Sequence, residues 1–131
     1  MEQRRFGNTD LVSSALGFGT WEMSTTSYGH IDIAEASAAV GQAIDAGITL
    51  FDTAEVYGPY HSEEILGRAL GRRRKEVVLV TKVGFVHDEN NKNIGRNASG
   101  DFVIADPAIG LELWSASKLE TLWQGNGLRV R

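Results

Sequence analysis

Hydrophobic residues follow two different periods along the first two thirds of the chain. Apolar side chains recur three and four positions apart over 32–46 and 62–71, which predicts two helices that each bury one face. Short apolar and β-branched runs at 48–52 and 77–82 predict parallel strands covered on both faces. A glycine-rich apolar segment at 16–20 predicts a third strand. The regular elements therefore alternate between strand and helix.

Turn and cap residues mark where these elements begin and end. The weak alternation over 3–15 surrounds a Gly-Asn turn signal, which predicts a β-hairpin. Asp32 is a good N-cap, and Glu35 lies three residues later, as in a capping box. Gly47 is placed to end the first helix in a left-handed conformation, and Gly71 to end the second.

The order of the elements predicts the fold class. Strand, helix, strand, helix, strand is typical of a parallel sheet with right-handed crossovers, so an α/β fold is expected. The pattern fades after Gly84: residues 87–100 are polar and are interpreted as a long loop, and Pro107 interrupts any helix there. A broad helical stripe returns at 111–123. We interpret 1–131 as a single domain.

Composition narrows the class of protein. With 42% hydrophobic residues in 131, the chain has enough apolar residues for a core. A formal charge of −4 argues against a nucleic-acid or anionic membrane partner. The sequence has no cysteine, no apolar run long enough to cross a membrane and no apolar signal segment after Met1. These features predict a cytoplasmic protein.

An acid, a phenol and an amine lie where the predicted strands end. Asp52 ends one strand, Tyr57 lies five residues further in a loop, and Lys82 ends the next strand. Parallel strands end at the same edge of a sheet, so we expect the three side chains to converge. Tyrosine normally has a pKa of about 10 and exchanges protons poorly at neutral pH. A neighbouring ammonium stabilises the phenolate, and a carboxylate holds that ammonium charged, which suits proton transfer to a carbonyl.

The same residues resemble the aldo-keto reductase family. The resemblance covers about residues 4 to 84 and joins several motifs in the family's order. They are Leu16-Gly17-Phe18-Gly19-Thr20-Trp21, Ala46-Gly47-Ile48, Phe51-Asp52-Thr53-Ala54, Tyr57-Gly58, Ser62-Glu63-Glu64-Ile65-Leu66-Gly67-Arg68-Ala69-Leu70 and Val80-Thr81-Lys82-Val83-Gly84. The resemblance implies a (β/α)₈ TIM-type barrel with an N-terminal hairpin at its base. It also implies NADPH as cofactor and a small-molecule aldehyde or ketone as substrate.

The resemblance also implies roles for particular residues. Tyr57 corresponds to the general acid that protonates the carbonyl oxygen, with Lys82 and Asp52 tuning it. Three consecutive residues, Gly19-Thr20-Trp21, correspond with Asp52 to part of the wall that holds cofactor and substrate. No metal site is implied.

The chain also departs from the family pattern. The family has a catalytic histidine at the end of the fourth strand, whereas this sequence has no histidine after His87. A complete barrel takes about 250 residues. We therefore expect an incomplete barrel of about three β/α units after the hairpin, with a divergent tail over 85–131. Truncation or a frame-shift after about residue 104 is a natural explanation, and we expect little activity from this chain.

Two other functions compete with a reductase. A non-catalytic remnant would act by binding another chain or a second copy through exposed sheet edges. A metal-dependent hydrolase would need ligands such as Asp52, Glu55 and His61, whose spacing fits no local ligand pattern. We interpret His61, like His30 and His87, as a solvated loop residue.

Overall fold

The computed structural model describes residues 1–5, 7–24, 29–82 and 84–97 of the chain. The predicted helical stripe at 111–123 and the break at Pro107 lie outside these residues. Within them, each of the regular elements expected from the sequence is present. No described helix has the length and apolar character needed to cross a membrane.

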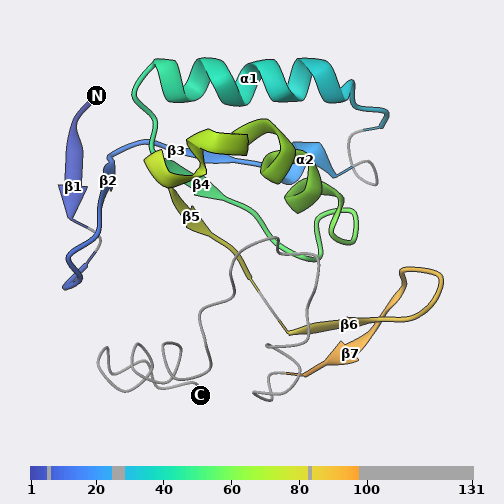
Figure 1. Ribbon diagram of the computed structural model, residues 1–131. Helices are drawn as coiled ribbons and strands as arrows, with labels where there is room; N and C mark the ends of the chain where they lie inside the picture. The colour runs from blue at the N-terminus through green and yellow to red at the C-terminus, as the bar shows by residue number, and fades with distance from the viewer. Residues whose placement is uncertain (6, 25–28, 83, 98–131) are drawn as a thin grey trace.

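A three-stranded parallel sheet forms the centre of the described structure (Figure 1). Its strands are β3 (Gly17–Gly19), β4 (Leu50–Asp52) and β5 (Val78–Val80), paired in that order. An antiparallel hairpin precedes it, made of β1 (Gln3–Arg5) and β2 (Val12–Ser14). The α/β class, the parallel pairing and the N-terminal hairpin are as predicted.

Ser14 fastens the hairpin to the sheet. Its hydroxyl oxygen accepts the backbone N–H groups of Thr49 at 2.8 Å and Leu50 at 3.2 Å, and donates to the Leu16 carbonyl. In return, the Ser14 N–H donates to the Thr49 hydroxyl at 2.8 Å. These bonds fix the hairpin at the end of the sheet where β4 begins, opposite the end that carries Asp52.

Two helices connect the parallel strands and lie together over the sheet (Figure 1). α1 (Ile33–Asp45) begins at Asp32, whose carboxylate accepts the N–H groups of Ala34 and Glu35, as the cap prediction requires. Gly47 follows α1 with a φ of 87°, a left-handed conformation that favours glycine. α2 (His61–Leu70) ends before Gly71.

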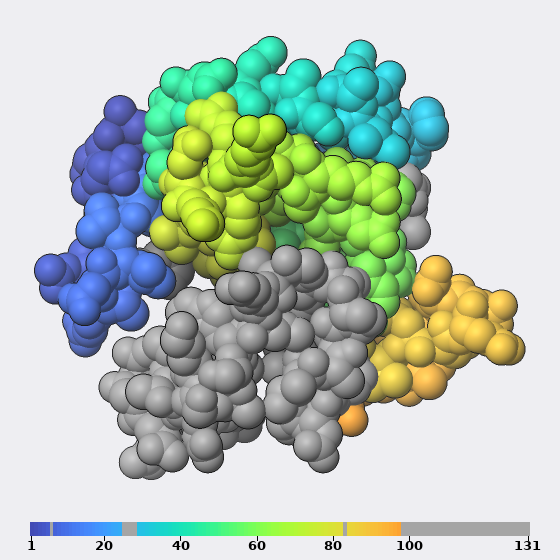
Figure 2. Space-filling view, in the orientation of Figure 1, coloured from blue at the N-terminus to red at the C-terminus, as the bar shows by residue number. Residues whose placement is uncertain are grey.

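The core lies between the helices and the strands. Phe51 of β4 is fully buried, and its ring centroid lies 5.4 Å from that of Phe18 on β3. The helices contribute a contiguous set of buried apolar side chains: Val40, Ala43, Ile44, Ile65, Leu66 and Leu70. This set contains most of the apolar stripes from which the helices were predicted. Figure 2 shows α1, in teal and cyan, along the top of the view and α2, in green, directly below it.

Three features were not predicted. A 3-10 helix, η1 (Trp21–Met23), follows β3, and Gly71 begins a second one, η2 (Gly71–Glu76). The interpretation of 87–100 as a long loop is wrong in part. There, β6 (Phe85–His87) and β7 (Asn93–Arg96) form an antiparallel hairpin that projects from the side of the molecule (Figure 2).

The second hairpin has a well-formed turn but strands that give little sequence signal. The Asp88 carboxylate accepts the N–H groups of Asn90 and Lys92, and Asn91 adopts a positive φ of 60°. Asp and Asn are well suited to such turns. The strands themselves are too short and too polar to give a clear alternation. The turn signal was present in the sequence, but the strand signal beside it was weak.

Candidate active site

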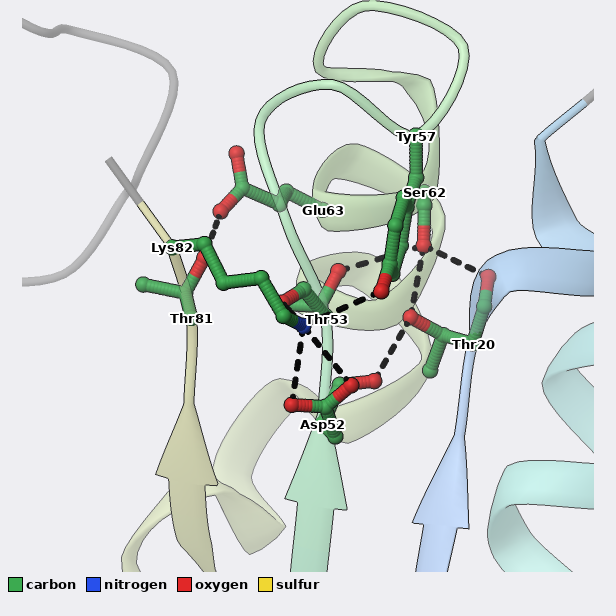
Figure 3. A network of polar contacts seen from close by, with 8 residues as sticks. All are labelled: Thr20, Asp52, Thr53, Tyr57, Ser62, Glu63, Thr81 and Lys82. Atoms are coloured by element: carbon green, nitrogen blue, oxygen red, sulfur yellow. Dashed lines mark hydrogen bonds and ion pairs between the residues drawn. The ribbon is translucent and has the colours of Figure 1, made fainter. Parts of the chain in front are cut away.

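Three side chains from separate segments meet where the parallel strands end (Figure 3). Asp52 is the last residue of β4, Tyr57 lies in the turns between β4 and α2, and Lys82 follows β5. The ammonium nitrogen of Lys82 lies 3.0 Å and 2.9 Å from the two carboxylate oxygens of Asp52, and 3.0 Å from the Tyr57 hydroxyl. The structure thus brings together the three residues that the sequence led us to expect.

Lys82 is the centre of this group. Its ammonium also donates to the Thr53 carbonyl oxygen at 3.0 Å and lies 4.9 Å from the centroid of the Tyr57 ring. Partial burial lowers the pKa of Lys82, but hydrogen bonds to Tyr57 and Asp52 and the attraction of the carboxylate outweigh it, so the pKa is raised overall. Lys82 therefore carries its positive charge at neutral pH.

The loop that carries Tyr57 is tightly turned. The Tyr57 N–H donates to the Ala54 carbonyl at 3.0 Å, and its own carbonyl accepts the N–H of Ser62 at 3.1 Å. Gly58 has a φ of 68°, and a Cβ at this position would lie 3.2 Å from Cα of Ser24. Glycine is therefore required here, both by conformation and by space.

Trp21 completes the surface around the tyrosine. Its ring stacks on that of Tyr57 with the centroids 5.9 Å apart and the planes 10° from parallel. Trp21 nevertheless remains 53% exposed. A flat aromatic wall thus lies beside the phenol hydroxyl, and it is open to solvent.

A buried cluster of hydroxyl groups lies behind the three charged and phenolic side chains. Its members, Thr20, Thr53 and Ser62, are each fully buried and come from β3, β4 and α2 or the residues next to them. The Ser62 oxygen lies 2.7 Å from the Thr20 hydroxyl and 3.2 Å from that of Thr53. The Thr20 hydroxyl in turn donates to the Asp52 carbonyl at 3.0 Å. The cluster holds the end of β4 to its neighbours.

The residues assigned by resemblance to the cofactor wall differ in exposure. Gly19 ends β3, and an added Cβ there would meet no atom within 4 Å. Trp21 is half exposed, as described above. Thr20 is buried, and its hydroxyl donates to the Asp52 carbonyl. Its side chain therefore holds the end of the strand in place and is not exposed to a cofactor or substrate.

Two glutamates near the site make buried contacts that were not predicted from the sequence. Glu55 is fully buried and accepts the backbone N–H of Phe85. Glu63 lies in the first turn of α2, is 8% exposed and accepts the hydroxyl hydrogen of Thr81. No local spacing in the sequence indicated these two contacts, because the partner of each glutamate lies on the segment after β5.

Two of the three histidines differ from the sequence interpretation. His30 is exposed, but His61 is the first residue of α2 and His87 lies on β6 with its ring edge-on to Tyr60, 5.9 Å away. Among the described residues, no group of three or more His, Asp or Glu side chains is arranged to hold a metal ion. The site is therefore an acid, a phenol and an amine, placed beside an aromatic wall.

Comparison with known proteins identifies the family. The model of the aldo/keto reductase family matches residues 15–102, about two thirds of the chain. The chain belongs to the aldo/keto reductase family. The matched range begins and ends later than the region 4–84 in which the sequence motifs lie.

Curated relatives agree with this assignment. Aldo-keto reductase YhdN of Bacillus subtilis is 37% identical over 101 residues, which cover 76% of this chain and 30% of the relative. A probable voltage-gated potassium channel subunit beta of Oryza sativa is 40% identical over 86 residues, covering 63% of this chain and 25% of the relative. The chain therefore spans less than a third of the length of these relatives.

Solved structures give the same result for the fold. Aldo-keto reductase AKR11C1 of Bacillus halodurans superimposes with a TM-score of 0.65 at 32% identity, over 79% of this chain and 33% of that one. The glycerol dehydrogenase AKR11B4 of Gluconobacter oxydans gives 0.62 at 34% identity, over 78% and 32%. The chain has the fold of the N-terminal part of the family's TIM barrel, and its described strands do not close into a barrel.

Proposed function

We propose that this chain carries the proton-transfer half of an aldo-keto reductase active site, for reduction of an aldehyde or ketone to an alcohol. The observation that supports the proposal best is the bridging position of the Lys82 ammonium, within 3.0 Å of both Asp52 and the Tyr57 hydroxyl. Each member alone is a common strand-end or loop residue. Their convergence at one atom is what proton transfer by a tyrosine requires.

In the proposed reaction, Tyr57 is the general acid. When the substrate's carbonyl oxygen accepts a hydrogen bond from the Tyr57 hydroxyl, the carbonyl carbon becomes more electrophilic. The oxygen then receives the proton as the alcohol forms. Lys82 stabilises the phenolate that is left, because its positive charge lies at hydrogen-bonding distance from the phenol oxygen. Asp52 keeps Lys82 charged and aims it through two short contacts. General acid catalysis of this kind contributes about 10²–10⁴ to a rate.

NADPH is the proposed hydride source, and the residues present fit one side of it. The hydride that NADPH supplies when bound reduces the carbonyl carbon. Gly19 leaves open space where a side chain would stand, and the exposed ring of Trp21 offers a flat apolar surface beside Tyr57. Gly19, Trp21 and Asp52 would border a small carbonyl substrate and the cofactor, with Thr20 holding β3 in place behind them.

A chimera tests this function directly. Residues 15–102, the range that the family model matches, would replace the equivalent segment of the Bacillus subtilis relative. We expect the chimera to oxidise NADPH in the presence of a reactive aldehyde, and Lys82→Met to reduce that rate. A chimera that folds by circular dichroism and binds NADPH, yet shows no turnover, would contradict the proposal.

Association through sheet edges is the competing proposal for the chain by itself. In the described structure β3 and β5 are the edge strands of the parallel sheet, and Leu16 next to β3 is 61% exposed. Unpaired strand edges invite pairing with another chain. We expect the chain to elute as an oligomer or aggregate in size-exclusion chromatography with light scattering. Leu16→Lys should shift it toward monomer, whereas Ile33→Lys, an exposed position on α1, should not. A monomeric chain at all concentrations would rule this out.

A further inference from the structure

The segment after β5 is bonded to two buried carboxylates, one on each side of Lys82. On the N-terminal side, the Thr81 hydroxyl donates to Glu63 of α2. On the C-terminal side, the Phe85 N–H donates to Glu55. Figure 3 shows the Thr81–Glu63 bond close to where the Lys82 side chain leaves the β5 extension and reaches toward Asp52 and Tyr57.

The backbone around these bonds is restrained as well. The Glu55 N–H points to the Lys82 carbonyl at 3.5 Å, so Glu55 meets the segment at two places. Gly84 has a φ of 119°, and its carbonyl accepts the Asn97 N–H at 2.7 Å. Thr81, Gly84 and Phe85, which lie near Lys82 in the sequence, therefore have bonding partners outside β4 and β5.

Burial strengthens the hydrogen bonds that Glu55 and Glu63 accept. Glu55 is fully buried and Glu63 is 8% exposed, so water competes little for their oxygens. Inside a protein a hydrogen bond is electrostatically stronger than in water. Lys82 itself is 46% exposed in its side chain, and a long solvated lysine has many rotamers to lose. A fixed backbone lowers the conformational entropy that is lost when the Lys82 ammonium stays between Asp52 and Tyr57.

We propose that Glu63 and Glu55 are positioning residues, which hold the segment that carries Lys82 so that its ammonium bridges Asp52 and Tyr57. The proposal rests on the function proposed above for these three residues. Glu63 acts through Thr81 and Glu55 through Phe85, and neither is assigned a proton-transfer step. The two carboxylates thus belong to the site by fixing one of its members.

Competitive acylation of the 131-residue chain tests the inference without requiring turnover. Acetic anhydride at mildly alkaline pH modifies only neutral amines, and peptide mass spectrometry reports Lys82 relative to Lys75, which lies in an exposed position. The bonds to Asp52 and Tyr57 raise the pKa of Lys82, so releasing it should increase its labelling; one pKa unit corresponds to tenfold in the neutral fraction. We expect Glu63→Ala and Thr81→Val each to increase the Lys82 ratio about threefold or more.

Conservative and neighbouring variants separate positioning from general destabilisation. Glu63→Gln keeps an oxygen that accepts the Thr81 hydroxyl hydrogen, so its ratio should stay near that of the parent chain. Glu64→Ala removes an exposed carboxylate on the same helix turn and should not raise it. Val40→Ala opens a buried position on α1, far along the chain, and provides a variant of lower stability by thermal unfolding.

The outcomes decide the inference. An increase confined to Glu63→Ala, Thr81→Val and Glu55→Ala supports it. An unchanged Lys82 ratio in these variants, or the same increase in Val40→Ala, overturns it. Because acylation does not depend on catalysis, a chimera without reductase activity would contradict the proposed function and leave this result standing.

Discussion

Purified by itself, the 131-residue chain should reduce a reactive aldehyde with NADPH far more slowly than about 1 s⁻¹, the low end of ordinary enzyme turnover. In the described part of the chain the parallel sheet has three strands and does not close into a barrel, so the walls that further barrel strands would supply are not among the described residues. The family resemblance also implies a histidine beyond Lys82, and the sequence has none after His87. Removing one donor of that kind in other enzymes costs about 10²–10³ in rate.

Loss of cofactor positioning should lower the rate further. Holding two reactants in near-attack geometry lowers an activation barrier by up to about 7–11 kcal/mol. The described residues border only one side of the proposed cofactor, so much of this effect should be lost. NADPH oxidation with nitrobenzaldehyde, followed by absorbance, measures the effect. Turnover at about 1 s⁻¹ or faster, abolished by Tyr57→Phe, would show that the chain is a complete catalyst and that this expectation is wrong.

The part of the fold that could be predicted is the part with a strong apolar period. α1 and α2 bury one stripe each, and β4 supplies Phe51 to the core between them, so pattern and packing coincide. The β6–β7 hairpin could not be predicted in this way. Its residues are half-buried or exposed, and its shape is fixed by the Asp88 turn rather than by a buried face.

Some residues of the site could likewise be predicted from the sequence and others could not. Asp52 and Lys82 lie where strands end, so elementary sheet geometry was enough to bring them together. Tyr57 followed from its place in the short loop between Asp52 and α2. The hydroxyl cluster of Thr20, Thr53 and Ser62 could not be predicted, because its members are 42 and 9 residues apart in the sequence. The same is true of Glu63 and Thr81, which are 18 residues apart. Such contacts depend on how α2 lies against the strands, and no local pattern encodes that placement.

In the chimera proposed above, Tyr57→Phe should lower kcat by about 10²–10⁴. The substitution keeps the ring that stacks on Trp21 and removes only the hydroxyl that bonds to Lys82, so the fold and the aromatic wall should remain. Without that hydroxyl, the carbonyl oxygen loses its proton donor while NADPH binding is little affected. The measurement is kcat with NADPH held at saturation, with NADPH affinity determined separately by fluorescence.

Tyr60→Phe is the matched control for this experiment. It removes a hydroxyl from the same loop, three residues further on, at a ring that packs on His87 rather than on Trp21. Its kcat should stay within about threefold of the parent chimera, since only a donor within hydrogen-bond reach of the reacting oxygen is a general acid. Equal losses in the two variants would mean that the loop tolerates no hydroxyl deletion and that Tyr57 has no special role. A large loss in Tyr57→Phe alone would place the proton donor at the phenol that Lys82 contacts, where the charge of Lys82 lies 3.0 Å from the oxygen that becomes negative.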